Sequence, residues 1–279
     1  MRALVTGAAS GIGRAVAGRL AAGGARLYLT DLHEEPLATV AARIRADGGT
    51  VVMTHAADVS DHAAVTAMAD RIHDDAGALD AVLNVAGIAT WGTVEAMSHE
   101  EWRTVIDVNL MGPIHVIEAF VPPMVRSGRG GHLVNVSSAA GLIGLPWHAA
   151  YSASKFGLRG VSEVLRFDLA RHGIAVTLAC PGGGDTPLTE TVRIAGIDTT
   201  SEAVTRFRER FRRHAVSADD AAAAIVEGML KRRYLVYTSA DIRLIHALQR
   251  YVPPAYALTM RLANRMADRV AASAPKADG

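Results

Sequence analysis

Tyr151 and Lys155 stand four positions apart in the segment AAYSASK, residues 149–155, with only small residues between them. On a helix, positions i and i+4 lie on one face about a turn apart, so the phenol and the ammonium can face the same space. An unperturbed Tyr titrates at about pH 10, and an ammonium one turn away stabilises its phenolate, which would suit acid–base chemistry near neutral pH. The alternative is that the two side chains only lie on a helix surface and have no chemical function.

A glycine-rich segment follows the first apolar run of the chain. TGAASGIG, residues 6–13, places Gly7, Gly11 and Gly13 where a strand would turn into a helix. Because these glycines have no side chains, backbone amides can approach a ligand at the positive end of that helix, and a pyrophosphate is the expected ligand. A tight turn without a ligand is the alternative interpretation.

Asp31 ends the second apolar run, close to the spacing of about 20 residues that places a carboxylate on an adenosine ribose. Such a carboxylate accepts hydrogen bonds from the 2′ and 3′ hydroxyls and repels a 2′-phosphate. The following residues, Leu32 and His33, supply no Lys or Arg, so the sequence favours NAD over NADP. The alternative is that Asp31 caps the helix expected near Pro36.

Short apolar runs alternate with longer Ala/Leu/Arg-rich segments of helical pattern. A strand–helix–strand order repeated six or seven times predicts right-handed crossovers and a parallel sheet covered on both faces. We therefore expect an α/β fold with a doubly wound parallel sheet of about seven strands, a Rossmann-like three-layer α/β/α arrangement, in a single domain spanning residues 1–279. The expected strands lie within residues 2–7, 25–31, 50–58, 78–87, 131–138, 173–182 and 233–238.

Composition narrows the classes of protein further. The chain has 279 residues, 50% of them hydrophobic and 20% charged, with a net charge of +1, which is typical of a globular protein and gives no strong electrostatic case for nucleic acid. The single cysteine, Cys180, excludes an intramolecular disulfide and fits a reducing compartment, and its apolar surroundings predict a buried, inert thiol. No targeting segment or good membrane span is visible, so we expect a cytoplasmic protein, and we expect no metal site.

The motifs together resemble those of the short-chain dehydrogenase/reductase family, in the family's order and over about residues 1–240. They are TGAASGIG (6–13), Asp31, Asp58 with Val59, NVAG (84–87), Asn109, Ser138, YSASK (151–155) and PGGGDT (181–186). The resemblance implies an NAD(P)-dependent enzyme that transfers a hydride between a nicotinamide cofactor and a CH–OH group.

The resemblance implies a catalytic set of four residues. Tyr151 is expected to be the general acid/base, and Lys155 to tune it and to hydrogen-bond the nicotinamide ribose. Ser138, at the end of an expected strand, is expected to hold the substrate oxygen and stabilise charge that develops there, with Ser137 as the competing candidate. Asn109 corresponds to the Asn that family members use in a water-linked proton relay with the Lys.

The cofactor contacts follow from the same resemblance. Asp58 and Val59 are expected to border the adenine, Asn84 and Gly87 to support the cofactor after the fourth strand, and Thr186 to meet the nicotinamide carboxamide. The expected cofactor-binding set is Gly7, Ser10, Gly11, Ile12, Gly13, Asp31, Asp58, Val59, Asn84, Ala86, Gly87, Tyr151, Lys155, Pro181, Gly182, Gly184 and Thr186.

Two positions depart from the family's pattern. Val85 stands where the family often has a second Asn, and Gly184 where it usually has a branched apolar residue that packs against the carboxamide. Because a PGGGD run has permissive dihedrals and high unfolded-state entropy, we expect the loop around Gly184 to be mobile without cofactor. A Gly184→Val change is expected to tighten NAD binding.

The substrate is expected to contact an inserted segment at about residues 187–214, with contributions from residues 141–148 and 87–93. Their apolar lining suggests a fairly apolar secondary alcohol or ketone, lipid-, steroid- or aromatic-like, although such residues often only cover a core. The lining residues are Leu142, Ile143, Leu145, Trp147, Ile88, Trp91 and Leu188. The basic run at residues 205–214 is expected to be a solvated face, with recognition of an acidic substrate tail as the alternative.

A basic amphipathic C-terminal extension is expected at about residues 240–279, broken at Pro253 and Pro254. It could pack on a neighbouring subunit, cover its own active site or lie on an anionic membrane, and packing on protein is favoured because amphipathic stripes usually face protein. The resemblance implies a homo-oligomer, either a tetramer or a dimer.

Other functions are weaker explanations of the same residues. A catalytically idle NAD-sensing protein on this fold would not need Ser138, Tyr151, Lys155 and Asn109 together. A Rossmann-like methyltransferase shares a glycine-rich turn and an acidic ribose contact, but it gives no reason for the Ser/Tyr/Lys set. An NADPH-dependent ketone reductase remains an alternative to the NAD-linked enzyme.

Overall fold

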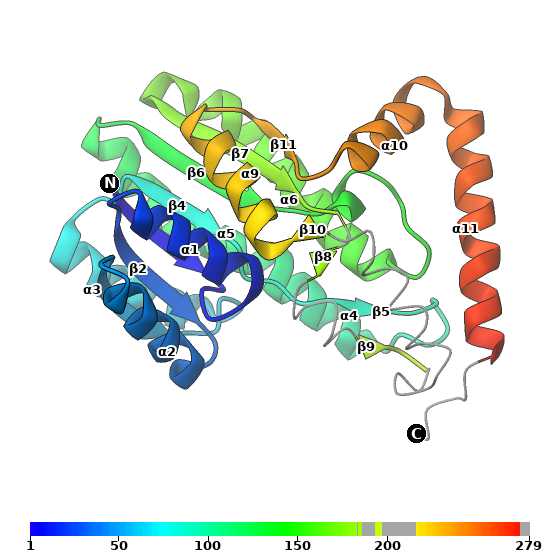
Figure 1. Cartoon of the computed structure of the whole chain (residues 1–279), viewed down its shortest axis with the longest axis horizontal. Helices are drawn as coiled ribbons and strands as arrows, with labels where there is room; N and C mark the ends of the chain where they lie inside the picture. Colours follow the sequence, from blue (N-terminus) through cyan, green and yellow to red (C-terminus); the bar gives the residue numbers. More distant parts are fainter. Residues whose placement is uncertain (183, 186–192, 197–215, 274–279) are drawn as a thin grey trace.

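The architecture is a seven-stranded parallel sheet with helices on both faces (Figure 1). The computed structural model describes residues 1–182, 184–185, 193–196 and 216–273. The strand order is β11-β7-β6-β4-β1-β2-β3, and every neighbouring pair runs parallel. The strands are β1 (Arg2–Thr6), β2 (Arg26–Asp31), β3 (Thr50–Ala56), β4 (Ala81–Asn84), β6 (Gly131–Val136), β7 (Ile174–Cys180) and β11 (Leu235–Tyr237).

Each strand lies within an apolar run that the sequence marks as a strand, and the predicted fold class is confirmed. The central strands are buried on both faces, as in β1, where Ala3, Leu4 and Val5 have no exposed surface. Strand β1 pairs with both β2 and β4, so the order of the strands reverses there. In open parallel sheets a ligand binds beyond the carboxyl ends of the strands at this reversal.

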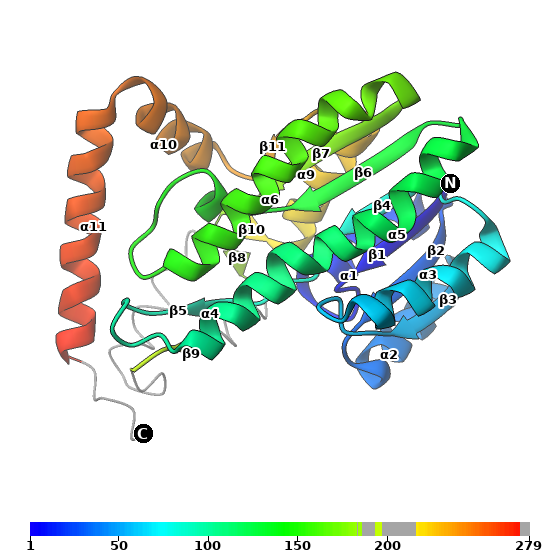
Figure 2. The same ribbon diagram turned by 180° about the vertical axis from the view of Figure 1, so that it is seen from behind.

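Helices cover both faces of the sheet (Figures 1 and 2). One face packs against the apolar sides of α1, α2 and α9, and the other against α3, α5 and α6. Each face therefore has its own apolar cluster, which gives the predicted three layers. The helices are α1 (Gly11–Ala22), α2 (Glu34–Ala46), α3 (His62–Ala76), α5 (Gly112–Ser127), α6 (Ala149–Asp168) and α9 (Ala218–Leu230).

Helix α4 (His99–Ile106) continues into α5 through a π-helical turn, η1 (Asp107–Met111), which contains Asn109. Of the residues described, one stretch, His99–Ser127, has the length and apolar composition of a membrane span, and 44% of its most apolar window is buried in the protein. Val116, Phe120 and Met124 from this stretch pack in the apolar cluster under the sheet. The stretch is therefore a core helix of this fold.

The fold also contains short elements that the sequence does not predict. Two-residue strands pair as β5 (Thr90–Trp91) with β9 (Arg193–Ile194), and as β8 (Gly184–Asp185) with β10 (Val216–Ser217). Two 3-10 turns, η2 (Ala139–Gly141) and η3 (Ala170–His172), follow β6 and α6. Residues 193–196 are the described part of the expected substrate segment; the rest of it, with Leu188 and the basic run at 205–214, lies outside the described residues.

The C-terminal extension forms α10 (Ala240–Tyr251) and α11 (Pro253–Ser273), and the chain changes direction at the expected prolines. Helix α11 stands at the far edge of the molecule, away from β3, in both views (Figures 1 and 2). Ile242 of α10 is buried in the core, and the Tyr256 hydroxyl of α11 accepts a hydrogen bond from the Gly144 amide at 3.0 Å. The extension is thus attached to the loop that precedes α6.

Candidate active site

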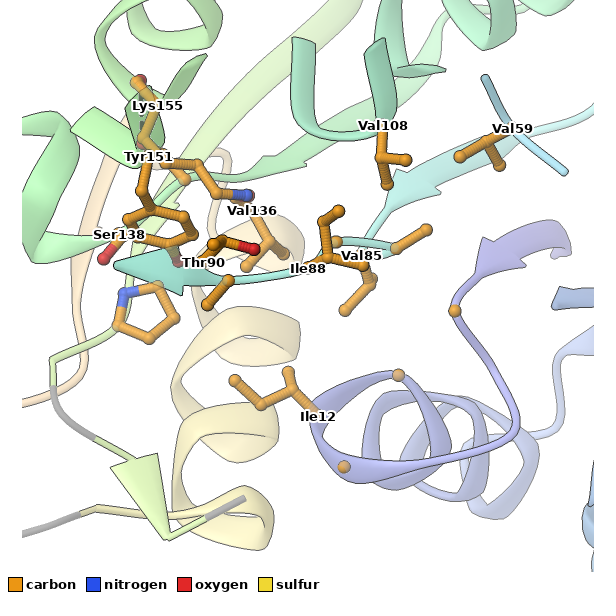
Figure 3. Close-up of a pocket in the computed structure, with 18 of the residues that line it drawn as sticks. Ile12, Val59, Val85, Ile88, Thr90, Val108, Val136, Ser138, Tyr151 and Lys155 are labelled. Atoms are coloured by element: carbon orange, nitrogen blue, oxygen red, sulfur yellow. Dashed lines mark hydrogen bonds between the residues drawn. The ribbon is translucent and has the colours of Figure 1, made fainter. Parts of the chain in front are cut away.

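A cavity of about 810 Å³ lies beyond the carboxyl ends of β1, β4 and β6. Figure 3 shows Ser138, Tyr151 and Lys155 grouped at one end of it, whereas Ile12 and Val59 lie away from this group. The expected site residues that line the cavity are Gly7, Ser10, Gly11, Ile12, Gly13, Asp31, Asp58, Val59, Ala86, Gly87, Ser138, Tyr151, Lys155, Pro181 and Gly182. Motifs that are distributed in the sequence from residue 7 to residue 182 therefore meet at this one cavity.

The glycine-rich loop requires glycine for steric reasons at two positions. Gly7 has a φ of +65°, and a Cβ there would lie 2.7 Å from Ala86 Cα. A Cβ on Gly13 would lie 1.9 Å from the Gly7 carbonyl oxygen. This distance is so short that any side chain at residue 13 would force the loop to move. Ser10 precedes α1, but its side chain makes no capping bond, so the first amides of the helix keep their capacity to bind an anion.

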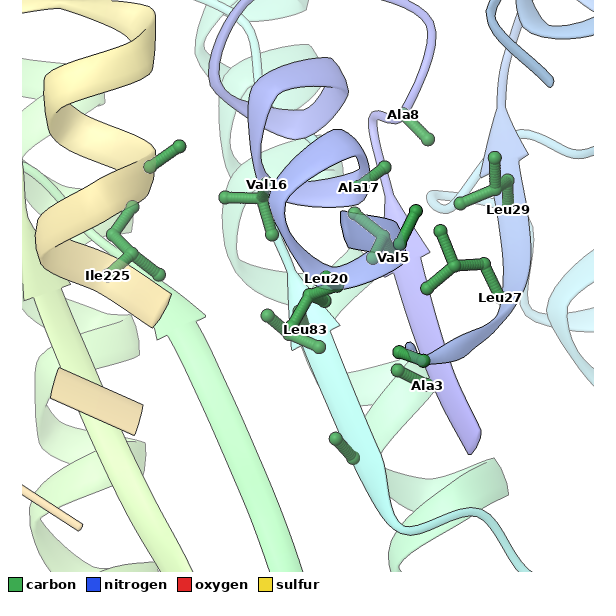
Figure 4. Close-up of a cluster of buried hydrophobic side chains, with 14 of the residues drawn as sticks. Ala3, Val5, Ala8, Val16, Ala17, Leu20, Leu27, Leu29, Leu83 and Ile225 are labelled. Atoms are coloured by element: carbon green, nitrogen blue, oxygen red, sulfur yellow. The ribbon is translucent and has the colours of Figure 1, made fainter. Parts of the chain in front are cut away.

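The packing beneath this loop holds it against the sheet (Figure 4). Val16 and Leu20 of α1 belong to the same buried apolar cluster as Val5 of β1 and Leu83 of β4. At the end of β1, the Thr6 hydroxyl accepts hydrogen bonds from the amides of residues 85 and 86, both at 3.0 Å. The loop after β1 and the turn after β4 are thus linked directly at the reversal of strand order.

Asp31 is oriented by the glycine-rich loop, with no hydrogen bond to the first turn of the next helix. Its Oδ2 accepts a hydrogen bond from the Ala9 amide at 2.9 Å, and its Oδ1 accepts one from the His33 amide at 3.3 Å. Helix α2 begins at Glu34 with His33 as its N-cap residue, so Asp31 does not cap this helix. Lys155 is the only Lys or Arg among the described residues that line the cavity.

Asp58 and Val59 follow β3 and line the cavity together. Asp58 Oδ1 accepts hydrogen bonds from the Ser60 amide at 2.8 Å and from the Ser60 hydroxyl at 2.7 Å, which fixes the turn. Val59 is buried, and a Cβ on Gly112 would lie 2.8 Å from it. This part of the wall therefore combines a fixed carboxylate with an apolar surface.

The two adjacent serines after β6 both line the cavity, but their hydroxyls have different environments. The Ser137 hydroxyl is buried and donates to the Lys155 carbonyl oxygen at 3.0 Å, inside helix α6. Ser138 lines the cavity, where its Oγ accepts from the Ala140 amide at 3.1 Å and lies in hydrogen-bonding range of the Tyr151 side chain. Of the two candidates, Ser138 is the one placed to meet a ligand beside the phenol.

Tyr151 and Lys155 both line the cavity from α6, and both are buried. The Lys155 Nζ lies 5.6 Å from the centre of the Tyr151 ring and donates to the Val136 carbonyl oxygen at 3.2 Å. Burial raises the pKa of Tyr151, whereas the hydrogen bond with Ser138 lowers it. Burial also lowers the pKa of Lys155 to about 8. The expected stabilisation of a phenolate is thus opposed by burial, and the phenol carries its proton at neutral pH.

Asn109 lies behind the cavity wall, buried in the π-helical turn. Its Nδ2 donates to the Ile88 carbonyl oxygen and its Oδ1 accepts from the Ile88 amide, both at 2.9 Å. A Cβ on Gly87 would lie 3.0 Å from Asn109 Oδ1 and 3.4 Å from Lys155 Nζ, so Gly87 separates these two groups. π-Helical turns occur often at functional sites, and the relay role of Asn109 stays a prediction.

Two other expected cofactor residues, Asn84 and Gly184, are not among the residues that line the cavity. Asn84 is buried and donates to Asn135 Oδ1 at 2.9 Å, and Asn135 donates to the Ser162 hydroxyl at 2.9 Å, so this amide chain joins β4, β6 and α6. Gly184 lies in β8 and is not among the lining residues. Thr186 lies outside the described residues. Val85, the first departure from the family pattern, does line the cavity.

The expected substrate loops contribute some of their apolar residues. Ile88, Trp91 and Leu145 line the cavity, whereas Leu142 and Ile143 are buried in the core next to α10. The expected lining residue Trp147 is not part of the cavity wall. Its neighbour His148 and Thr90, which fall within the expected substrate segments without being named there, do line the cavity, and so do Thr104, Asp107 and Val108, which the sequence does not mark as site residues.

Other chemistries find no support in the described residues. Among them no group of three or more His, Cys, Asp or Glu side chains could hold a metal ion. Cys180 is buried, and burial raises the pKa of its thiol to about 12, so the thiol is inert as predicted.

Comparison with known proteins identifies the group to which these motifs belong. Residues 1–195 match the family model described as short chain dehydrogenase. The chain is 35% identical over 256 residues to a putative oxidoreductase, SadH, of Mycobacterium tuberculosis, covering 91% of each chain. A short chain dehydrogenase/reductase from Burkholderia phymatum in complex with NAD has a TM-score of 0.81 at 32% identity, covering 89% of this chain and 92% of that one. A metagenomic short-chain oxidoreductase in complex with NADP has a TM-score of 0.66 at 33% identity, covering 86% and 92%.

Proposed function

The chain belongs to the short-chain dehydrogenase/reductase family and is an NAD(P)-dependent oxidoreductase that acts on CH–OH groups, and we propose that it interconverts a fairly apolar secondary alcohol and the corresponding ketone with NAD as its cofactor. The observation that carries this proposal is the grouping of Ser138, Tyr151 and Lys155 at one end of a cavity whose other end is a glycine-rich loop. We also propose that residues 1–279 act as one oxidoreductase domain.

The proposed reaction follows from the groups at the catalytic end. A bound nicotinamide cofactor supplies the hydride for reduction or accepts it for oxidation. In oxidation the carbinol C–H bond breaks with its electron pair, and the O–H proton passes to Tyr151 in its phenolate form, so the phenol must first release its own proton. In reduction the carbonyl carbon gains the hydride, and Tyr151 donates its proton to the oxygen, which agrees with the raised pKa of this phenol. Ser138 holds the reacting oxygen beside the phenol.

Lys155 has two proposed roles. Its ammonium, one helical turn from Tyr151, stabilises the phenolate that forms when Tyr151 gives up its proton. Its Nζ also lies beside the Gly87 turn, where a ribose hydroxyl can accept from it. Asn109, on the other side of Gly87, is proposed to connect Lys155 to solvent through water.

Asp31 supports the choice of NAD. Its carboxylate is held at the adenosine end of the cavity by the Ala9 and His33 amides, and the described wall offers no cation there to bind a 2′-phosphate. A 2′-phosphate would also be repelled by the carboxylate. The relatives bind either cofactor, since one solved structure contains NAD and another NADP.

The proposed substrate is apolar over part of its surface because Ile88, Trp91 and Leu145 line the cavity near Tyr151. We propose a cytoplasmic homo-oligomer, a dimer or tetramer. The exposed side chains Leu258 and Met266 on α11 support an oligomer, because a second copy could cover them. Peripheral membrane contact through the same helix is the alternative that we favour less.

Tyr151→Phe tests the proposed activity against a cofactor-sensing role. The variant should bind NADH with unchanged affinity, measured by nicotinamide fluorescence, while turnover falls by about 10²- to 10⁴-fold because the proton donor is lost. Tyr237→Phe is the matched control, since Tyr237 bonds His246 and does not line the cavity. Retained turnover in Tyr151→Phe would refute the assignment of this residue.

A further inference from the structure

His148 is a cavity residue that the proposed mechanism does not use. It is the N-cap residue of α6, one turn before Tyr151, and it lines the same end of the cavity. Its ring stacks on Trp91 with the centroids 4.3 Å apart and the planes inclined by 33°. The ring of Tyr151 meets it edge-on, with the centroids 6.1 Å apart. The imidazole is therefore held between a wall residue and the proposed proton donor.

The protonation of this imidazole is fixed by its neighbour. Nδ1 lies 2.5 Å from the Pro146 carbonyl oxygen, and because a carbonyl oxygen can only accept, Nδ1 must carry the proton. Burial lowers the pKa of His148 to about 4, so the ring is neutral at physiological pH. Nε2 is then a lone-pair acceptor, and no other group in the described part of the chain donates to it.

The backbone before His148 is strained in a way that sets the position of the ring. Trp147 has a φ of +64°, and the only other non-glycine residue with positive φ among those described is Arg232. The Trp147 carbonyl oxygen accepts from the Gly92 amide at 2.8 Å, which ties this loop to the β5 segment that carries Trp91. Strain of this kind persists only where the surrounding structure over-determines it, and it is common in ligand-binding sites.

We propose that His148 Nε2 is a specificity-determining acceptor for an O–H or N–H group on the substrate carbon next to the reacting one. The preferred substrates are then vicinal diols and amino alcohols, or the corresponding α-hydroxy and α-amino ketones, with an apolar remainder. This inference rests on the proposed alcohol and ketone chemistry at Tyr151. A carboxylate at the same position is disfavoured, because two lone-pair acceptors would face each other.

The spacing of the two groups supports this substrate class. The ring centroids of Tyr151 and His148 lie 6.1 Å apart at one end of α6, so a group on the carbon next to an oxygen held by Tyr151 and Ser138 is within reach of His148. Trp91 and Leu145 make much of the wall there apolar or aromatic, and Thr90 adds a hydroxyl. A donor on the substrate pairs with Nε2, whereas a methyl group in its place leaves Nε2 desolvated and unpaired.

The test uses a pair of ketones that differ only in this group, 2-hydroxyacetophenone and propiophenone, with NADH. The native enzyme should prefer the hydroxy ketone by about tenfold in kcat/KM, the value of one well-formed hydrogen bond. His148→Phe keeps an aromatic ring against Trp91 but lacks the acceptor, so the ratio of the two kcat/KM values should fall to about one. His148→Gln, which restores an acceptor oxygen, should recover part of the preference.

His246→Phe is the matched control, because it makes the same change at a histidine that bonds Tyr237 and does not line the cavity. Its preference for the hydroxy ketone should equal that of the native enzyme. A preference that survives in His148→Phe, or that is absent from the native enzyme while both ketones are turned over, would overturn the proposal.

A second measurement separates this proposal from the proposed function. Imidazole ¹⁵N NMR of the NADH-bound protein should show the His148 Nδ1–H tautomer, and its Nε2 signal should shift on addition of 2-hydroxyacetophenone but not of propiophenone. That response without any turnover would support the His148 subsite while refuting the alcohol and ketone activity. The opposite tautomer, or no selective shift, would overturn the subsite.

Discussion

The two ends of the cavity meet their ligands by different means. At the cofactor end the wall is largely main chain, with Gly7 and Gly13 allowing the loop to approach the turn after β4. At the catalytic end the wall is built from side chains, with Tyr151, Lys155 and His148 all contributed by one end of α6. The cofactor end is therefore sensitive to the addition of a single carbon, whereas the catalytic end is sensitive to charge and hydrogen bonding.

The largest expected effect is at the cofactor end. Gly13→Ala places a Cβ 1.9 Å from the Gly7 carbonyl oxygen, so the loop must move. We expect the protein to lose about 2 kcal/mol of stability and NADH affinity to fall roughly 100-fold, because the amides no longer converge on the phosphates. Thermal unfolding and fluorescence titration measure the two effects.

Gly18→Ala is the matched control for this change in the same helix, since a Cβ on Gly18 meets nothing within 4 Å. It should raise stability by up to about 1 kcal/mol through helix propensity and leave NADH affinity unchanged. Equal affinities in Gly13→Ala and the native protein would contradict main-chain recognition at this end.

The second effect concerns charge at the catalytic end and depends on pH. Reduction needs the Tyr151 proton, which the raised pKa retains, and the Lys155 charge, which is present below its pKa of about 8 and lost above it. We therefore expect kcat/KM for ketone reduction to be level at neutral pH and to fall by up to about tenfold per pH unit above about pH 8.

Lys155→Met should lower the rate at neutral pH and remove the inflection near pH 8. Lys231→Met is the control, because Lys231 is exposed on the surface and pairs with Glu227 at 2.6 Å. An unchanged inflection in Lys155→Met would show that another group sets the profile.

The smallest expected effect concerns Gly184, which the resemblance to the family, and not the lining of the cavity, connects with the cofactor. Gly184→Val should tighten NAD binding severalfold, because the substitution restricts a glycine-rich loop and adds a branched side chain near the carboxamide. Calorimetric titration of the variant and the native protein measures this difference. Identical affinities would count against the importance of Gly184.

The sequence predicts the fold well because its signals are local. All seven strands of the main sheet lie in apolar runs with clear boundaries, and the alternation with helices determines the parallel topology. The two-residue pairs β5–β9 and β8–β10 are not predicted, because strands so short have no periodic pattern and form only through tertiary contacts. The pattern of helical spacing also does not predict the π-helical turn that contains Asn109.

The site shows the same division between local and long-range information. Gly7, Gly13 and Asp31 are recognisable because the proposed phosphate and ribose contacts lie in one strand–helix–strand unit. His148 is not recognisable, because its role depends on the positive φ of Trp147 and on stacking with Trp91 from another part of the chain. The direction of the Tyr151 pKa also requires the structure, since burial opposes the neighbouring charge.

The most direct test of the account is to titrate the native protein with NADH and NADPH, following nicotinamide fluorescence, and then to add aliphatic, aromatic and steroid-like ketones to the preferred cofactor. The account predicts tighter binding of NADH, through Asp31, and oxidation of NADH in the presence of some of the ketones, through Tyr151. Preference for NADPH would contradict the role of Asp31, and cofactor binding without turnover of any ketone in the panel would contradict the proposed activity.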